Sequence, residues 1–131
     1  MSLFVDASAL IAMMIKEPEH LALEARFGAD EDRLYSALSA WETARGLASI
    51  RTVPIGEAQA EIARFVHDFA KRLVSIGTVE AQLAIAAHNR YGKGQHPAKL
   101  NMGDCFAYAC AKANGAALLY KGDDFARTDL A

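Results

Sequence analysis

Cysteine is scarce in this sequence, with only Cys105 and Cys110 among 131 residues. The two positions do not form a CxxC motif, and on a helix a spacing of five residues separates their side chains by about 140°. This arrangement suits neither a shared metal ion nor a disulfide bridge. We therefore expect both to be small buried apolar side chains, which excludes a disulfide-stapled domain and a thiolate metal site.

Long hydrophobic runs are also missing. The longest apolar run near the start covers Ala9 to Ile15 and ends at Lys16 and Glu17, which is too short to span a bilayer. Asp6 interrupts the N-terminal stretch and no basic segment precedes it, a pattern that argues against a secretory signal. These features predict a cytoplasmic protein without a membrane segment.

A strong excess of charge of either sign is absent, because the formal net charge is −2. The overall basic character of many nucleic-acid-binding proteins is therefore missing. Basic side chains are nevertheless concentrated locally, since residues 81–103 contain no Asp or Glu but include His88, Arg90, Lys93, His96 and Lys99. A protein of slightly negative net charge can still present one basic surface.

Short strand-like segments alternate with helical patterns along the chain. The patterns predict strands at residues 3–5, 34–37, 73–76 and 117–120, and helices over residues 7–15, 19–27, 39–50, 62–73, 79–91 and 103–114. The alternation implies a parallel sheet with helices on both faces. Because there is no repeat, low-complexity tract or linker, residues 1–131 are expected to form a single α/β/α three-layer domain.

Acidic side chains stand where these predicted strands end or helices begin. Asp6 and Asp123 follow strands, whereas Glu42 and Asp104 lie in the first turns of helices. In an open parallel sheet, the strand ends and the following helix starts lie along one edge, and ligand sites form there. The four carboxylates are therefore predicted to converge.

Each of these acids also has a purely structural explanation. Asp6 or Asp104 suits a helix N-cap, and Ser39–Glu42 fits a capping box in which the glutamate reaches back to the helix start. Asp123 or Asp124 suits a turn. If the acids only cap helices, the chain is a non-catalytic α/β protein-binding module. A receiver-like signalling domain fits less well, because the paired acids follow the last strand rather than the first.

Converging carboxylates repel one another, and a divalent cation would keep them ionised. Magnesium prefers oxygen ligands, and such sites support phosphodiester hydrolysis. No competing chemistry is evident, because the four histidines show no ligand spacing and no GxxxxGK(S/T) phosphate loop occurs. We therefore expect Mg²⁺, with Mn²⁺ as a possible substitute, and no nucleotide cofactor.

Four segments occur in a characteristic order: VDASAL at 5–10, SAWE at 39–42, GDCFAYA at 103–109 and KGDDF at 121–125. Together they resemble the PIN domain, and more narrowly the VapC toxins of bacterial toxin–antitoxin pairs. The resemblance covers the chain from Leu3 to its end. It implies a metal-dependent endoribonuclease with a parallel-sheet α/β/α fold.

The resemblance also implies roles for the matching positions. The catalytic and metal-binding acids of the family match Asp6, Glu42, Asp104 and Asp123. Asp124 is the alternative fourth acid, and Ser8 matches a hydroxyl residue that supports the first acid. An RNA substrate, a small cognate antitoxin that blocks the site, and a homodimer are implied in the same way.

The acid-free stretch is a candidate contact for the RNA backbone. Arg90, Lys93 and Lys99 are each able to meet a phosphate. Arg45 is another candidate, because it lies about one helical turn past Glu42 and on the same face. The alternative is that these are solvated side chains of a basic loop.

Overall fold

The computed structural model describes residues 1–69 and 72–131, and a four-stranded parallel sheet forms its centre. The strand order is β3-β2-β1-β4. The strands are β1 (Ser2–Val5), β2 (Asp32–Ser36), β3 (Arg72–Val74) and β4 (Ala117–Leu119). All three strand pairs are parallel, as the sequence pattern predicted.

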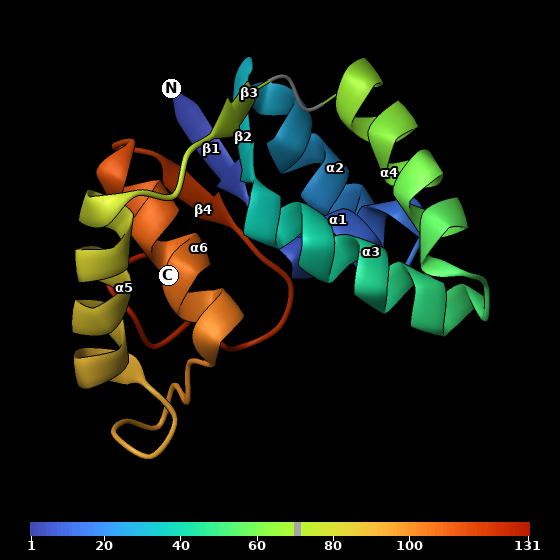
Figure 1. Cartoon of the computed structure of the whole chain (residues 1–131). Helices are drawn as coiled ribbons and strands as arrows, with labels where there is room; N and C mark the ends of the chain where they lie inside the picture. Colours follow the sequence, from blue (N-terminus) through green and yellow to red (C-terminus); the bar gives the residue numbers. More distant parts are fainter. Residues whose placement is uncertain (70–71) are drawn as a thin grey trace.

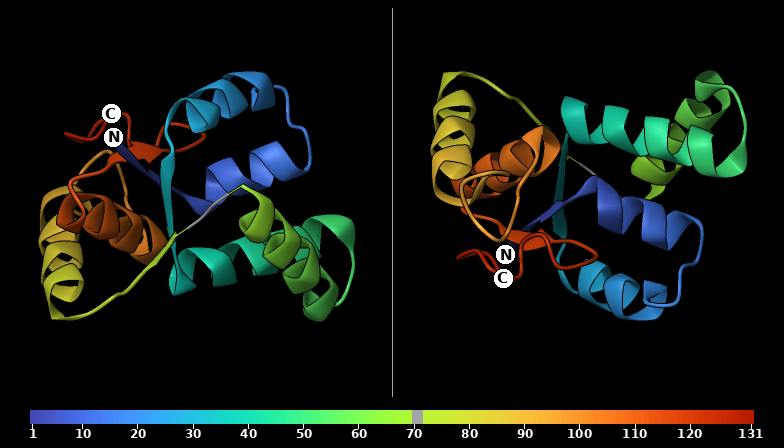
Figure 2. Two further views of the ribbon diagram at one scale, coloured as in Figure 1. Left: turned by 90° about the horizontal axis from the view of Figure 1, so that it is seen from above. Right: turned by 90° about the horizontal axis from the view of Figure 1, so that it is seen from below.

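Helices in the described residues pack on both faces of this sheet (Figures 1 and 2). Their bounds are α1 (Ala7–Met14), α2 (His20–Ala29), α3 (Ala37–Arg51), α4 (Ile55–Asp68), α5 (Thr78–Tyr91) and α6 (Met102–Ala113). Helices α5 and α6 lie on one side of the sheet, and α1 to α4 lie on the other (Figure 2). The predicted α/β/α three-layer architecture is therefore confirmed.

The central strand β1 is buried on both faces. Phe4 belongs to the core cluster that includes α5 and α6, whereas Leu3 and Val5 belong to the cluster that includes α1 and α2. This division follows from the alternation of side chains along a strand. It explains why β1 has an uninterrupted apolar sequence rather than an alternating one.

The carboxyl ends of β1 and β4 are tied together. Val5 is paired with Leu119, and the Asp6 backbone N–H donates to the Leu119 carbonyl at 2.9 Å. Strand β2 lies on the other side of β1, so the strand order reverses at β1. Such a reversal is where open α/β sheets form their ligand sites.

One predicted helix has different bounds. The helical spacing of Ile62, Phe65, Phe69 and Leu73 suggested a helix to residue 73, but α4 covers Ile55–Asp68. Leu73 belongs to β3, as the alternative prediction of a strand at 73–76 had it, and pairs there with Tyr35 of β2. Pairing with β2 overrides the local helical pattern because it satisfies the backbone of the strand. Residues 70–71, also covered by that predicted helix, lie outside the described residues.

Two other expectations concern cysteine and the membrane. Cys105 and Cys110 are free and buried on α6, as expected.

Within the ranges that the structure covers, every helix is too short or too polar to cross a membrane.

Candidate active site

Asp6 is the buried acid at the end of the central strand. It is the N-cap of α1, and its Oδ2 accepts hydrogen bonds from the Ser8 backbone N–H at 3.1 Å and the Ser8 hydroxyl at 2.5 Å. The Ser8 oxygen in turn accepts from the Lys121 backbone N–H at 3.0 Å. Ser8 therefore connects the first acid to the segment after β4, 113 residues away in the chain.

Glu42 is half-buried on α3 and is not a capping residue. The predicted Ser39–Glu42 capping box is wrong, because the box is formed by Ser36 and Ser39: each backbone N–H is bonded to the other's side-chain oxygen, at 2.9 and 3.1 Å. Strand β2 ends at Ser36, and the Ser36 hydroxyl caps α3. The helix therefore begins at Ala37, two residues before the predicted start at residue 39. The structural explanation offered for this glutamate therefore does not apply.

Gly103 is the residue against which the Glu42 carboxylate lies. A Cβ atom at position 103 would overlap the Glu42 side chain. The absence of a side chain there lets the glutamate approach the first turn of α6, where Asp104 lies. A glycine directly before Asp104 is therefore required by the packing of Glu42.

Asp104 is buried at the third position of α6 and takes part in a capping box. Its Oδ2 accepts from the Asn101 backbone N–H at 3.0 Å, and its own backbone N–H donates to Asn101 Oδ1 at 2.9 Å. The N-cap is Asn101 rather than Asp104. The sequence signal was available, because an Asn three residues before an Asp is a capping pattern.

Burial and mutual repulsion raise the pKa values of these acids. Burial is the main cause for Asp6, whose pKa is raised despite the hydrogen bonds from Ser8. Burial, followed by the charges of Asp6 and Asp104, raises the pKa of Glu42 to about 7. The nearby Arg45 partly opposes this shift. Acids from three different segments therefore lie within electrostatic reach of one another.

Asp104 has a similar environment. Burial raises its pKa to about 6, against the hydrogen bond from Asn101, and the charges of Asp6 and Asp124 raise it further. The charge of Asp124 also raises the pKa of Asp6. Both Asp123 and Asp124 are exposed in the turn after β4. The sequence favoured Asp123 as the fourth acid, whereas these electrostatic effects favour Asp124.

The chemistry of this donor set suits a hard divalent cation. Carboxylate oxygens are the ligands that Mg²⁺ prefers. The side chains are not gathered into a finished coordination sphere, because in residues 1–69 and 72–131 no three His, Cys, Asp or Glu side chains are grouped closely enough to hold an ion. Mg²⁺ keeps several of its waters, so acids spaced more widely than one sphere can still hold it through water.

The candidate basic residues lie on α3, at the end of α5 and in the loop before α6. The Arg45 guanidinium lies 5.8 Å from the Trp41 ring centre, on the helix that carries Glu42. Arg90 covers the Tyr91 ring at 4.7 Å. Lys93 and Lys99 are exposed in the loop between α5 and α6.

Backbone hydrogen bonds join the two ends of the loop between α5 and α6. The Lys93 N–H donates to the Leu100 carbonyl, and the Leu100 N–H donates to the Tyr91 carbonyl, both at 3.0 Å. Its two ends are thus fixed next to Asn101, at the start of the helix that carries Asp104.

Lys121 was not singled out by the sequence as a site residue. Its backbone bonds Ser8, while its ammonium group pairs with Glu17 and lies 3.7 Å from Glu19. These ion pairs join the segment after β4 to the connection between α1 and α2. No local sequence signal could have shown a pairing across about a hundred residues.

Comparison with known proteins places the chain in a family. The PIN domain model matches residues 3–130. The chain therefore belongs to the PIN-domain family.

Within this family, the chain is similar to several curated VapC ribonucleases. The chain is 43% identical to VapC ribonuclease Mb0640 of Mycobacterium bovis, over 97% of this chain and 95% of the relative. The same values hold for Ribonuclease VapC30 of Mycobacterium tuberculosis. VapC ribonuclease R02377 of Rhizobium meliloti is 39% identical, over 97% of this chain and 98% of the relative. The resemblance to VapC proteins that the sequence motifs suggested is confirmed.

Solved structures show the same fold at lower identity. Mycobacterium tuberculosis VapC20, described as a sarcin-ricin loop cleaving toxin, superposes with a TM-score of 0.72 at 16% identity, covering 95% of this chain and 92% of that chain. A chain from a toxin–antitoxin complex of Klebsiella pneumoniae superposes with a TM-score of 0.70 at 20% identity, covering 99% and 94%.

Proposed function

We propose that this chain is a divalent-metal-dependent endoribonuclease and the toxin of a toxin–antitoxin pair. The observation that carries the proposal is the meeting of Asp6, Glu42 and Asp104 from three segments at the carboxyl edge of the sheet, where the Glu42 carboxylate lies against Gly103 beside Asp104. The charges of Asp6, Asp104 and Asp124 help to raise the pKa values of these three acids. The names of the VapC ribonuclease relatives support RNA as the substrate.

In this proposal, Asp6, Glu42 and Asp104 hold Mg²⁺, for which Mn²⁺ can substitute, and the Asp123–Asp124 pair supplies the fourth acid. A divalent ion bound there would balance charge on the phosphate oxygens and lower the pKa of water. Ser8 keeps Asp6 in place through its two hydrogen bonds. Helices α3 and α6 both begin at this edge of the sheet, so their positive dipole ends lie there and favour a negatively charged substrate.

The proposed RNA-binding surface extends from the acids over the neighbouring basic side chains. Arg45 is close enough to Glu42 to lower its pKa, so its charge lies beside the acids. Lys93 and Lys99 protrude from the loop that leads into α6, and Arg90 precedes that loop. Each can contact a backbone phosphate without reading a base.

The proposed protein partner is a small cognate antitoxin. An open apolar groove of about 430 Å³ lies between α3, α4 and β3. Trp41, Ile55 and Leu73 line it and are each at least half exposed. Exposed apolar patches of this kind mark protein-binding surfaces. Trp41 directly precedes Glu42 on α3, so a chain docked in this groove would lie on the helix that carries this acid. We also propose that the protein acts in the cytoplasm as a homodimer.

Incubation of the purified, antitoxin-free protein with total cellular RNA tests the activity. We expect discrete fragments with Mg²⁺ or Mn²⁺, and none when the ion is chelated. Intact RNA with both ions, in the presence of a folded protein by circular dichroism, would instead favour the non-catalytic binding module.

A further inference from the structure

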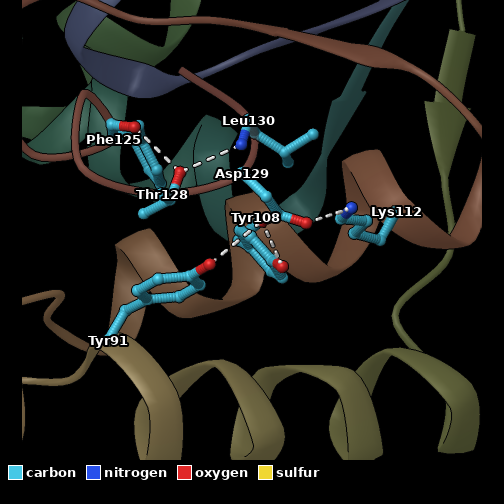
Figure 3. Close-up of polar contacts among 7 residues, drawn as sticks. All are labelled: Tyr91, Tyr108, Lys112, Phe125, Thr128, Asp129 and Leu130. Atoms are coloured by element: carbon cyan, nitrogen blue, oxygen red, sulfur yellow. Dashed lines mark hydrogen bonds and ion pairs between the residues drawn. The ribbon is translucent and has the colours of Figure 1, made fainter.

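Asp129 holds the C-terminal tail onto two helices (Figure 3). Its Oδ1 accepts hydrogen bonds from the Tyr108 hydroxyl at 2.6 Å and the Tyr91 hydroxyl at 3.4 Å. Its Oδ2 is 2.6 Å from the Lys112 ammonium group. Charge-assisted bonds of this length are the stronger class of hydrogen bond. One carboxylate thus joins the tail to α5 and α6.

The chain between Asp129 and the acidic turn is itself fixed. Phe125 is almost fully buried, and its ring lies 5.3 Å from the Tyr120 ring. The Thr128 hydroxyl and backbone N–H both donate to the Phe125 carbonyl, at 2.8 and 3.1 Å. The Ala126 N–H donates to the Asp123 carbonyl at 3.1 Å. The chain from Asp123 to Asp129 is therefore a short, internally hydrogen-bonded segment.

Helix α6 is shared by the acid site and by this tail contact. Asp104, Tyr108 and Lys112 are spaced four residues apart, so they follow one face of the helix. At one end of that face Asp124 lies within electrostatic reach of Asp104. At the other end Asp129 binds Tyr108 and Lys112. The tail is thus bonded to α6 at Tyr108 and Lys112, one and two helical turns from Asp104.

We propose that Asp129 is a positioning residue that sets the register of the Asp123–Asp124 turn against Asp104. This inference rests on the proposed function, because it assumes that the turn supplies an acid to a divalent-ion site. Asp129 itself faces Tyr91, Tyr108 and Lys112 and does not touch the acids. Its effect on ion binding must therefore pass through the turn.

The test is an Mn²⁺ titration of the full chain without RNA, followed by electron paramagnetic resonance of the free ion. Asp129→Ala is expected to raise the Kd for Mn²⁺ severalfold, up to about the tenfold that is the lower end of what losing a partner bonded directly to a metal ligand costs. Tyr108→Phe, which removes one hydroxyl only, should shift the Kd in the same direction and by less. It is the variant to measure if D129A does not fold.

Two controls separate positioning from a general loss of stability. Ile62→Val trims a buried side chain between α3 and α4 and should lower the melting temperature without changing the Kd. In a D123N/D124N background, D129A should have almost no further effect, because the residues through which it acts are already neutral.

Three results would overturn the inference: an unchanged Kd in both D129A and Y108F, an equal rise in I62V, or a full additional loss in the D123N/D124N background. Failure of the proposed function is a separate result, since it would show as Mn²⁺ binding by the unmodified chain without RNA cleavage.

Discussion

At the scale of single residues, the site is defined by carboxyl groups that the fold makes costly to ionise. Glu42 has a pKa of about 7, chiefly through burial and then through the charges of Asp6 and Asp104. The unfolded chain ionises the same group at its ordinary pKa near 4.5. Between these values the folded state binds more protons than the unfolded state, so Glu42 lowers the stability of the metal-free protein as pH rises from about 4.5 to 7.

Replacing Glu42 with glutamine should therefore stabilise the metal-free protein at high pH. At pH 8 in a chelator, we expect Glu42→Gln to raise the free energy of unfolding by about 1–2 kcal/mol, after allowing for solvent screening of a half-buried group. The gain should shrink toward pH 5, where Glu42 is largely protonated. Thermal unfolding at both pH values measures it, and Glu31→Gln at an exposed loop position is the control. If the variant is no more stable than the unmodified chain at pH 8, then burial and the charges of Asp6 and Asp104 do not destabilise the ionised Glu42.

The sequence was sufficient to predict some of these residues and not others. The position of Asp6 at the end of β1 could be predicted, because a strand pattern ends at Val5 and a helix-capping pattern begins at Asp6. The predicted role of Glu42 in a cap was wrong because α3 begins earlier, with Ser36 at the end of β2 as its capping residue. The choice between Asp123 and Asp124 depends on how the turn runs after Gly122, whose φ of 92° is a left-handed conformation that the sequence does not specify.

At the scale of elements, the start of α6 and the loop before it bring charges of opposite sign together. The loop between α5 and α6 carries Lys93 and Lys99, and it ends at the capping box of Asn101 and Asp104. An RNA backbone that reaches the acids would therefore pass the loop.

Removing the two loop lysines should weaken RNA binding and also make it less dependent on salt, because two phosphate contacts are lost. For single-stranded RNA we expect Lys93→Ala with Lys99→Ala to reduce the slope of log K against log salt by about 1.4, or about 0.7 per phosphate contact. Fluorescence anisotropy at several salt concentrations measures the slope, in an Asp104→Asn background that should not cleave the RNA. Lys16→Ala is the control, because Lys16 is a well-exposed lysine paired with Glu24. A slope unchanged from that of the parent would mean that these lysines do not contact RNA.

The elements themselves were largely predictable, because strong periodicity and capping residues specify them locally. The boundary between α4 and β3 was not, since Leu73 fits a helical pattern and a strand equally well until β2 is available to pair with it. Tertiary pairing decides such cases.

At the scale of the whole molecule, the strand order is what brings the site together. The alternation of strands and helices predicts a parallel sheet, but it does not specify which strands are neighbours. With β1 between β2 and β4, the segments after β1 and β4 meet, as the bond from the Lys121 N–H to Ser8 shows. Helices α3 and α6 then direct Glu42 and Asp104 to the same place.

The most direct test of the account is RNA cleavage by Asp104→Asn with Mn²⁺, beside the unmodified protein. The asparagine oxygen can still accept the Asn101 N–H, so the cap and the fold should be kept. The account predicts a normal circular dichroism spectrum and a loss of cleavage larger than the roughly 10–100-fold that an outer-shell partner is worth. Cleavage by the folded variant at the rate of the unmodified protein would contradict the claim that the carboxylates at this sheet edge carry the chemistry.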